Sequence, residues 1–212
     1  ETYKDISEIL DIDILNAKVK KITYGLVVNT PAEINYNNWM YYKSKPPTPM
    51  LKGGRKYGAK FYSTDFNIKG YDKKMELKLH NGIVVEQDMF RVEVEVKYMK
   101  HLLKRKHPIN IYTVADILDY ENIQYLMNDL LDKYNTIEKS PLYDFSKLNK
   151  QDRLIVSMLS FDQARGFLQK KEKHNYKRYY SRKKMINKEQ NLDYAKVTEL
   201  LLFNKATELL NS

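Results

Sequence analysis

The segment FNIKGYDKKMEL, residues 66–77, brings together side chains that could carry out covalent chemistry. Tyr71 is followed by a lysine, Lys73, and then by a carboxylate, Glu76. A tyrosine with a pKa of about 10 is only about a thousandth ionised at neutral pH, and a nearby ammonium favours the nucleophilic phenolate. The same spacing also suits a packed aromatic residue. With 18 tyrosines and 37 basic residues in the chain, a Tyr-x-Lys pattern is expected by chance.

A second segment, residues 90–97, alternates apolar and charged side chains. Its charged positions are Arg91, Glu93, Glu95 and Lys97, which alternate with Val92, Val94 and Val96. This alternation predicts a half-buried strand with one polar face. On its own, the polar face suits cross-strand ion pairs near solvent.

The elements that must position these residues form an α+β pattern. Expected strands are residues 19–28, 59–62, 66–71 and 90–98, and expected helices are residues 32–42, 113–118, 121–134, 152–169 and 192–210. Residues 43–54 contain three prolines and two glycines and are expected to be a loop, and Asn81-Gly82 is expected to be a tight turn. We therefore expect an antiparallel or mixed sheet with packed helices in residues 1–140. A helical, basic C-terminal region would follow in residues 141–212.

The net charge of +10 is concentrated in residues 165–188, which hold ten Lys or Arg and one acidic residue. Such a segment indicates contact with a polyanion. Interleaved Tyr176, Tyr179 and Tyr180 favour nucleic acid, because aromatic rings beside cations can stack on bases. A solvated, charged helix face is the alternative. Candidate DNA contacts are Lys177, Arg178, Tyr179, Arg182, Lys183 and Lys184, together with Arg91 and Lys97 on the alternating strand.

Composition excludes several classes of protein. The absence of cysteine excludes a disulfide framework and a thiolate zinc site. No run approaches the roughly 18 apolar residues that span a bilayer. The first residues also lack the basic flank and apolar segment of a signal peptide. These observations favour a cytoplasmic protein with no membrane partner.

The order of the motifs resembles the phage and plasmid replication proteins of the gene II/X type. More distantly, it is similar to the rolling-circle initiators of small Gram-positive plasmids. The resemblance covers roughly residues 20–134. It rests on Tyr71-x-Lys73-x-x-Glu76, on the later Arg-x-Glu strand, and on the TVADIL segment at residues 113–118. It implies a domain similar to the nicking domains of those proteins.

In those families a tyrosine nicks one DNA strand. The resemblance implies that Tyr71 is the nucleophile and Lys73 its cationic neighbour. It also implies that Glu93, with Glu76 or Glu95, holds Mg²⁺ or Mn²⁺. The implied intermediate is a 5′-phosphotyrosyl link with a free 3′-hydroxyl. Implied partners are single-stranded or origin DNA, a host helicase and a polymerase.

The sequence departs from the family pattern at the metal ligands. None of its four histidines has a second histidine two residues away, and Thr23 stands where an acidic residue is usual. The chain begins at Glu1, ahead of what resembles the middle of these proteins, so we expect an N-terminal part of the domain to be missing. A non-catalytic DNA-binding protein derived from such an initiator is the main alternative. An interaction protein that assembles through its C-terminal leucines is a third hypothesis.

Overall fold

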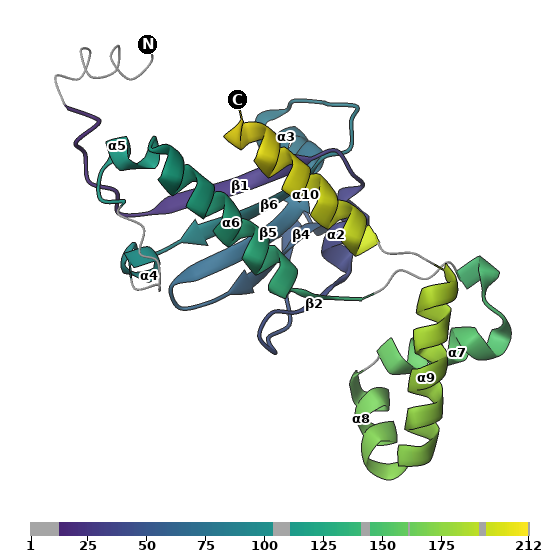
Figure 1. Cartoon of the computed structure of the whole chain (residues 1–212). Helices are drawn as coiled ribbons and strands as arrows, with labels where there is room; N and C mark the ends of the chain where they lie inside the picture. Colours follow the sequence, from purple (N-terminus) through teal and green to yellow (C-terminus); the bar gives the residue numbers. More distant parts are fainter. Residues whose placement is uncertain (1–12, 104–110, 141–144, 161, 191–193, 212) are drawn as a thin grey trace. The chain divides into compact units, whose positions relative to one another are not determined.

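The computed structural model describes residues 13–103, 111–140, 145–160, 162–190 and 194–211, and it has an α+β fold (Figure 1). The chain forms two compact units, one of residues 1–138 with 198–212 and one of residues 139–197. The boundary expected at residue 140 lies close to this division. The C-terminal end differs from the expectation, because residues 198–212 belong to the sheet unit and not to the basic helical unit.

Five antiparallel strands form the main sheet, in the order β1-β6-β5-β4-β3. Their bounds are β1 (Ile22–Val28), β3 (Thr48–Lys52), β4 (Arg55–Tyr62), β5 (Phe66–Asp72) and β6 (Phe90–Val96). The strands expected near residues 19–28, 66–71 and 90–98 are therefore confirmed. β5 has β4 and β6 as neighbours, and β6 has β5 and β1, so the two segments that carry the candidate chemistry are adjacent inner strands.

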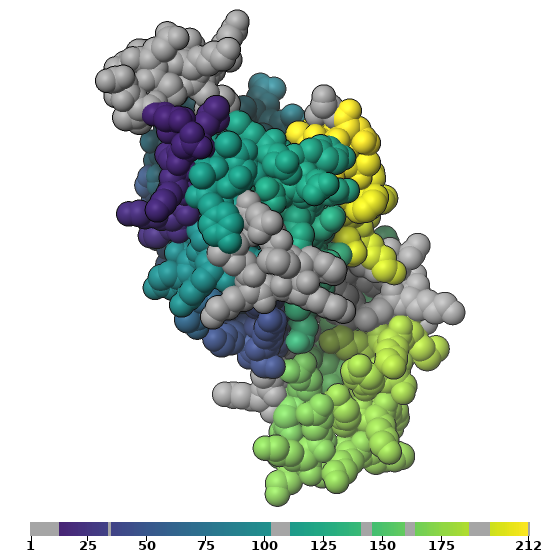
Figure 2. Space-filling model, turned by 60° about the vertical axis from the view of Figure 1, so that its left-hand side comes forward, coloured from purple at the N-terminus to yellow at the C-terminus, as the bar shows by residue number. Residues whose placement is uncertain are grey.

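The helices of the first unit are α2 (Ala32–Asn37), α3 (Lys73–Asn81), α4 (Lys100–Leu103), α5 (Val114–Ile117), α6 (Tyr120–Thr136) and α10 (Tyr194–Leu210), the last from residue 198 onward. Helices α2, α6 and α10 cover one face of this sheet, whereas α3 lies beside the opposite face. Strands β2 (Trp39–Tyr41) and β7 (Glu138–Lys139) form a separate pair. In Figures 1 and 2, α6 and α10 lie side by side, and Figure 1 shows both against the sheet.

The core lies between the helices and the apolar face of the sheet. Alternate residues of the strands point to this face, as the two-residue period of a strand requires. α10 belongs to this core because its Leu202 and Ala206 are buried in it with Leu130 and Tyr134 of α6. The main buried strand residues are Tyr24, Leu26, Val28, Phe61, Phe66, Ile68, Phe90, Val92, Val94 and Val96.

Three local expectations differ from the structure. Residues 43–54 contain strand β3, and Pro49 is tolerated there because an edge strand is paired on one side only. Gly53 and Gly54, with φ of +56° and +76°, turn the chain into β4. The helix expected over residues 32–42 ends at Asn37 and gives way to β2. The tight turn expected at Asn81-Gly82 does not join two strands, because Gly82 ends α3 in the left-handed conformation.

The second unit is helical. It contains the short 3₁₀ helix η1 (Phe145–Lys147) and helices α7 (Lys150–Ser160), α8 (Asp162–Lys171) and α9 (Lys173–Gln190). The single helix expected over residues 152–169 is thus two helices, and residue 161 between them lies outside the described residues. Ile155, Leu159 and Leu168 form a small core between α7 and α8, against which α9 packs Tyr176 and Tyr179.

Candidate functional site

The polar side chains of β5 and β6 lie on the face of the sheet opposite the buried core. The antiparallel register forms the cross-strand pairs Tyr71–Arg91, Lys69–Glu93 and Asn67–Glu95. Since residues two apart on a strand share a face, the two motifs that the sequence places far apart meet on a single surface. The alternation of residues 90–97 therefore brings Arg91 and Glu93 beside Tyr71, while Glu95 lies farther along the same face, opposite Asn67.

Tyr71 is held at the junction of a strand and a helix. The next residue, Asp72, caps α3 by accepting a hydrogen bond of 2.8 Å from the Met75 amide. On the other side, Gly58 of β4 is the register partner of Tyr71, and a Cβ at Gly58 would lie 2.6 Å from the Tyr71 Cβ. Glycine at this position therefore allows β4 to lie close to β5. In this setting Tyr71 is only 6% exposed.

The Tyr71 hydroxyl donates a hydrogen bond of 3.0 Å to Oε2 of the buried Glu93. Glu93 is itself held by two cations, because Lys69 Nζ lies 3.1 Å from Oε1 and Arg91 Nε lies 3.0 Å from Oε2. A hydroxyl bonded to a base that a third group orients is the arrangement of an activated nucleophile. The geometry thus allows Glu93 to accept the phenolic proton.

The surroundings of Tyr71 favour its neutral form. Burial raises the pKa of Tyr71 above its ordinary value, the negative charge of Glu93 raises it further, and the nearby Arg91 cation opposes them. The phenol is therefore protonated at neutral pH. As a nucleophile it would have to pass its proton to Glu93 during the attack, because prior ionisation is disfavoured.

Tyr71 and Glu93 line a pocket of about 200 Å³ on this face. The other lining residues are Met50, Tyr57, Lys69, Glu76 and His80. Sequence reasoning missed Lys69 and His80 as site residues. A periodicity signal was available for both, since Lys69 lies two residues before Tyr71 on the strand and His80 lies four after Glu76 on α3.

Lys73 lies at the start of α3 and pairs with Glu76 one turn later, at 2.5 Å. The cations that contact the carboxylate bonded to Tyr71 are instead Lys69 and Arg91. The structure thus brings Tyr71 and Glu93 into direct contact. It gives Lys69 and Arg91 the place that the resemblance implies for Lys73.

Glu95 belongs to the same network. Its Oε2 accepts from Asn67 Nδ2 at 3.0 Å and pairs with Lys69 at 3.1 Å and with Lys60 at 3.4 Å. The Asn67 hydrogen bond, followed by the hydrogen bond and charge of Lys69 and by the charge of Lys60, lowers the pKa of Glu95 to about 2. Lys69 Nζ therefore bridges Glu93 and Glu95 and compensates the charge of both.

The three carboxylates expected to hold Mg²⁺ or Mn²⁺ do not fit a divalent ion as they are arranged. Glu93 and Glu95 share the ammonium of Lys69, and Glu76 pairs with Lys73. Among the described residues, no group of three or more His, Asp or Glu side chains is placed to hold a metal ion. A divalent cation binds where several oxygen ligands converge without competing cations.

The candidate DNA contacts of the sheet unit are engaged within it. Arg91 pairs with Glu93, and Lys97 Nζ donates to the Ser63 carbonyl at 2.6 Å. Neither side chain is fully exposed, so neither is presented as a solvated cation.

The candidate DNA contacts of the second unit all lie on α9, but they have different roles. Arg182 forms a bidentate ion pair with the buried Asp152 of α7, with Nε–Oδ1 and Nη2–Oδ2 distances of 2.8 and 2.7 Å. It therefore connects α9 to α7. Lys177, Arg178 and Lys184 are exposed, and the last two lie over the rings of Tyr179 and Tyr180. Lys183 and the half-buried Tyr179 point toward the packed side of the helix.

Comparison with known proteins adds no family assignment, since no protein-family model matches this chain and no curated protein matches it. Within the described parts of the chain, no helix is long and apolar enough to cross a membrane.

Proposed function

We propose that this chain nicks and rejoins single-stranded DNA through Tyr71, with Glu93 as the base that accepts the phenolic proton. The observation that carries the proposal is the 3.0 Å hydrogen bond from the Tyr71 hydroxyl to Glu93, in a pocket that Lys69 also lines. The order of the sequence motifs and the basic segment at residues 165–188 support DNA as the substrate.

The reaction is a transfer of a phosphoryl group to tyrosine. The Tyr71 oxygen attacks a backbone phosphorus while its proton passes to Glu93. The phenolic oxygen–phosphorus bond forms, the bond from phosphorus to the 3′ oxygen breaks, and that oxygen takes up a proton from solvent. The DNA is then held as a 5′-phosphotyrosyl ester. Since the ester conserves the bond energy, the 3′-hydroxyl can attack it and rejoin the strand.

Lys69 and Arg91 supply positive charge at this centre. Both contact Glu93 at 3.0–3.1 Å, so they lie close to where negative charge develops on the attacked phosphate. No step is assigned to Mg²⁺ or Mn²⁺, because lysines already pair with the candidate ligands.

We infer origin DNA as the natural form of the substrate. The nicked strand ends in a 3′-hydroxyl, which a host polymerase extends, and a host helicase would separate the strands ahead of it. This role places the protein in the cytoplasm. These partners follow from the proposed reaction and from the resemblance in motif order.

A non-catalytic DNA-binding protein is the second candidate. Two observations favour it, namely that Tyr71 is only 6% exposed and that burial and Glu93 raise its pKa. In this function Tyr71 and Glu93 would hold β5 and β6 together, and DNA would contact other surfaces.

The two candidates are separated by the formation of a covalent adduct. Single-stranded oligonucleotides labelled at the 5′ or 3′ end are incubated with the full chain, with Mg²⁺, Mn²⁺ or a chelator, and separated on a denaturing gel. Tyr62→Phe is the matched control, since Tyr62 is an exposed tyrosine on the neighbouring strand β4. We expect a protein–DNA band that Tyr62→Phe retains and Tyr71→Phe lacks. DNA retention without a band in any arm would favour the second candidate.

A further inference from the structure

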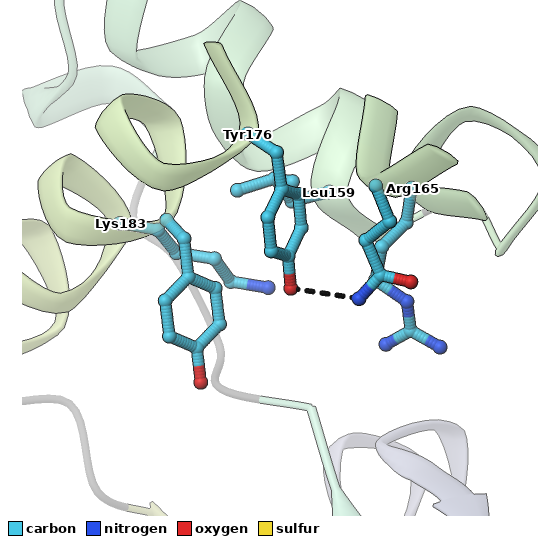
Figure 3. Close-up of a pocket in the computed structure, with 6 residues that line it drawn as sticks. Leu159, Arg165, Tyr176 and Lys183 are labelled. Carbon is cyan, nitrogen blue, oxygen red and sulfur yellow. Dashed lines mark hydrogen bonds between the residues drawn. The ribbon is translucent and has the colours of Figure 1, made fainter. Parts of the chain in front are cut away.

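Acid–base groups distinguish the pocket of the candidate site from a pocket of about 250 Å³ in the second unit. The described lining of the second-unit pocket has no carboxylate or histidine, the groups that exchange protons most readily near neutral pH. Its tyrosine, Tyr176, instead accepts a hydrogen bond of 2.9 Å from the Gln169 side chain (Figure 3). The pocket of the candidate site is lined by Glu76, Glu93 and His80. Of these, His80 has no role in the chemistry described above.

His80 is held in the wall of this pocket by α3. Glu76 and His80 lie one turn apart on this helix, which therefore presents both to the pocket. Gly82 ends the helix two residues later. Lys52 of β3 donates a hydrogen bond of 2.7 Å to the carbonyl of Leu79, directly before His80. These contacts fix the backbone that carries His80 against the sheet.

The imidazole of His80 is free to exchange protons. The residue is exposed, and none of the residues that the structure describes forms a hydrogen bond or an ion pair with its side chain. Imidazole both gives and takes protons at neutral pH, and it is the commonest general acid or base in enzymes. His80 can therefore take up a proton from solvent and pass it to a group bound in the pocket.

Lys69 is poorly suited to the same task. Burial lowers the pKa of Lys69, but the charge of Glu93 and the hydrogen bonds to Glu93 and Glu95 outweigh burial and raise the pKa above its ordinary value. Lys69 therefore keeps its proton at neutral pH. It contributes a positive charge to the pocket and not a transferable proton.

The remaining polar groups of the lining are also poor proton donors. Glu76 is paired with Lys73 at 2.5 Å, and an ionised carboxylate accepts protons and has none to give. Tyr57 packs edge-on against the ring of Tyr71, with centroids 6.3 Å apart and an angle of 74° between planes. A phenol is a far weaker acid than an imidazolium. Among the described residues of this lining, His80 is therefore the best proton donor.

The placement of His80 also suits the geometry of the proposed reaction. In phosphoryl transfer, the attacking and leaving oxygens lie roughly in line across the phosphorus, so the base and the acid must act at separate points. Tyr71 and Glu93 come from the sheet, whereas His80 comes from α3. The pocket of about 200 Å³ leaves room for a phosphate group beside all three.

We propose that His80 is the general acid that protonates the leaving 3′ oxygen of the DNA. The inference rests on the proposed nicking reaction and identifies the group through which the solvent proton of that reaction enters. The bond from the phenolic oxygen to phosphorus forms while the bond from phosphorus to the 3′ oxygen breaks, and the 3′ oxygen takes the proton of the His80 ring. In rejoining, neutral His80 removes that proton from the 3′-hydroxyl, and Glu93 returns its proton to Tyr71.

The test replaces the leaving oxygen by sulfur. Single-stranded oligonucleotides labelled at the 3′ end carry either oxygen or sulfur at the 3′ bridging position of the linkage that the parent chain nicks. A thiolate leaves without a proton, so the sulfur substrate does not need a general acid. The full chain is compared with His80→Gln and with the matched control Lys78→Gln, an exposed position on the same helix. The rate of formation of the covalent band is measured under single-turnover conditions, and circular dichroism verifies that each variant keeps its structure.

With the oxygen substrate, we expect His80→Gln to form the adduct at least about 10²-fold more slowly than the parent, the usual contribution of a general acid. With the sulfur substrate, His80→Gln should react within about threefold of the parent. Glu93→Gln should be slow with both substrates, because the base acts on the phenol whatever the leaving group. Lys78→Gln should match the parent with both.

Two results would overturn the inference while the nicking function stands. One is that His80→Gln reacts as fast as the parent with the oxygen substrate, and the other is that His80→Gln is slowed equally with both substrates. If the parent forms no adduct with either substrate, the nicking function fails, and the role of His80 fails with it. Adduct formation by the parent thus distinguishes the two failures.

Discussion

Tyr71 and Glu93 are joined by a hydrogen bond of 3.0 Å although they are not register partners, since Tyr71 lies opposite Arg91 and Glu93 lies opposite Lys69. The contact is diagonal across the β5–β6 ladder, within the reach of long side chains. It places Glu93 between the phenol of Tyr71 and the ammonium of Lys69. Glu93 therefore contacts both the proposed nucleophile and its neighbouring cations, Lys69 and Arg91.

Replacing Glu93 by glutamine should abolish proton transfer while keeping the shape of the site. We expect Glu93→Gln to slow adduct formation by about 10²- to 10⁴-fold, the usual contribution of a general base. Glu95→Gln changes a carboxylate on the same strand that does not contact Tyr71, so it should slow the reaction much less. The rates are measured from the appearance of the covalent band under single-turnover conditions. Equal rates in the parent and Glu93→Gln would contradict the role assigned to Glu93.

Removing the bridging ammonium should change the affinity of the site for metal ions. Lys69→Gln leaves Glu93 and Glu95 without the cation that they share. We therefore expect the affinity of this variant for Mn²⁺ to be at least about tenfold higher than that of the parent. Lys78→Gln, an exposed position on α3, is the control and should leave the affinity unchanged. Isothermal titration of the folded chain measures both. Equally tight binding by the parent and Lys69→Gln would show that Lys69 does not block a metal site.

The low pKa of Glu95 makes a specific contribution to stability against acid. The folded-state pKa of about 2 lies below the ordinary value of 4.5, so the folded state favours the ionised carboxylate. This contribution is fully present above about pH 4.5 and is lost as the pH falls toward about 2. The stability difference between the parent and Glu95→Gln should therefore shrink across this range, as followed by urea unfolding at several pH values. A difference that does not change with pH would contradict the assignment.

Arg182 should matter for stability more than its neighbours on α9. Arg182→Gln leaves the buried Asp152 carboxylate without its bidentate partner, at a cost of about 1–3 kcal/mol. Lys177→Gln removes the same charge from an exposed position and should have little effect. Hydrogen exchange of the α7 and α9 amides in the full chain reports the local opening. Equal protection in the two variants would mean that the Asp152–Arg182 pair does not hold these helices together.

Much of the main sheet was predictable, because the alternation of apolar and polar residues within a strand indicates both the strand and its faces. The alternation of residues 90–97 predicts both the strand and the shared face of Arg91, Glu93 and Glu95, and the structure confirms this. The short helix expected at residues 113–118 is also confirmed as α5, and Thr113 and Asp116 form a reciprocal capping box at its start. These features depend on residues close in sequence, so a single sequence carries their signal.

Features that depend on distant neighbours were not predictable. In sequence, Lys73 is nearer to Tyr71 than Arg91 is. However, Lys73 lies in the helix that Asp72 caps and pairs there with Glu76. The strand register instead brings Arg91 beside Glu93. Likewise, the prolines of residues 43–54 argue against an inner strand but say nothing about an edge. The placement of α10 depends on the burial of Leu202 in a core formed mostly by residues before 138.

The most direct test of the central claim locates the DNA attachment in the protein. The full chain is incubated with a single-stranded oligonucleotide, digested with nuclease and protease, and analysed by mass spectrometry for a peptide that carries a nucleotide through a phosphate ester. The account predicts the modification on Tyr71, in the peptide that contains GYDK, and its loss in Tyr71→Phe. A modification on another tyrosine, or DNA binding with no modified peptide, would contradict the proposal that Tyr71 is the nucleophile.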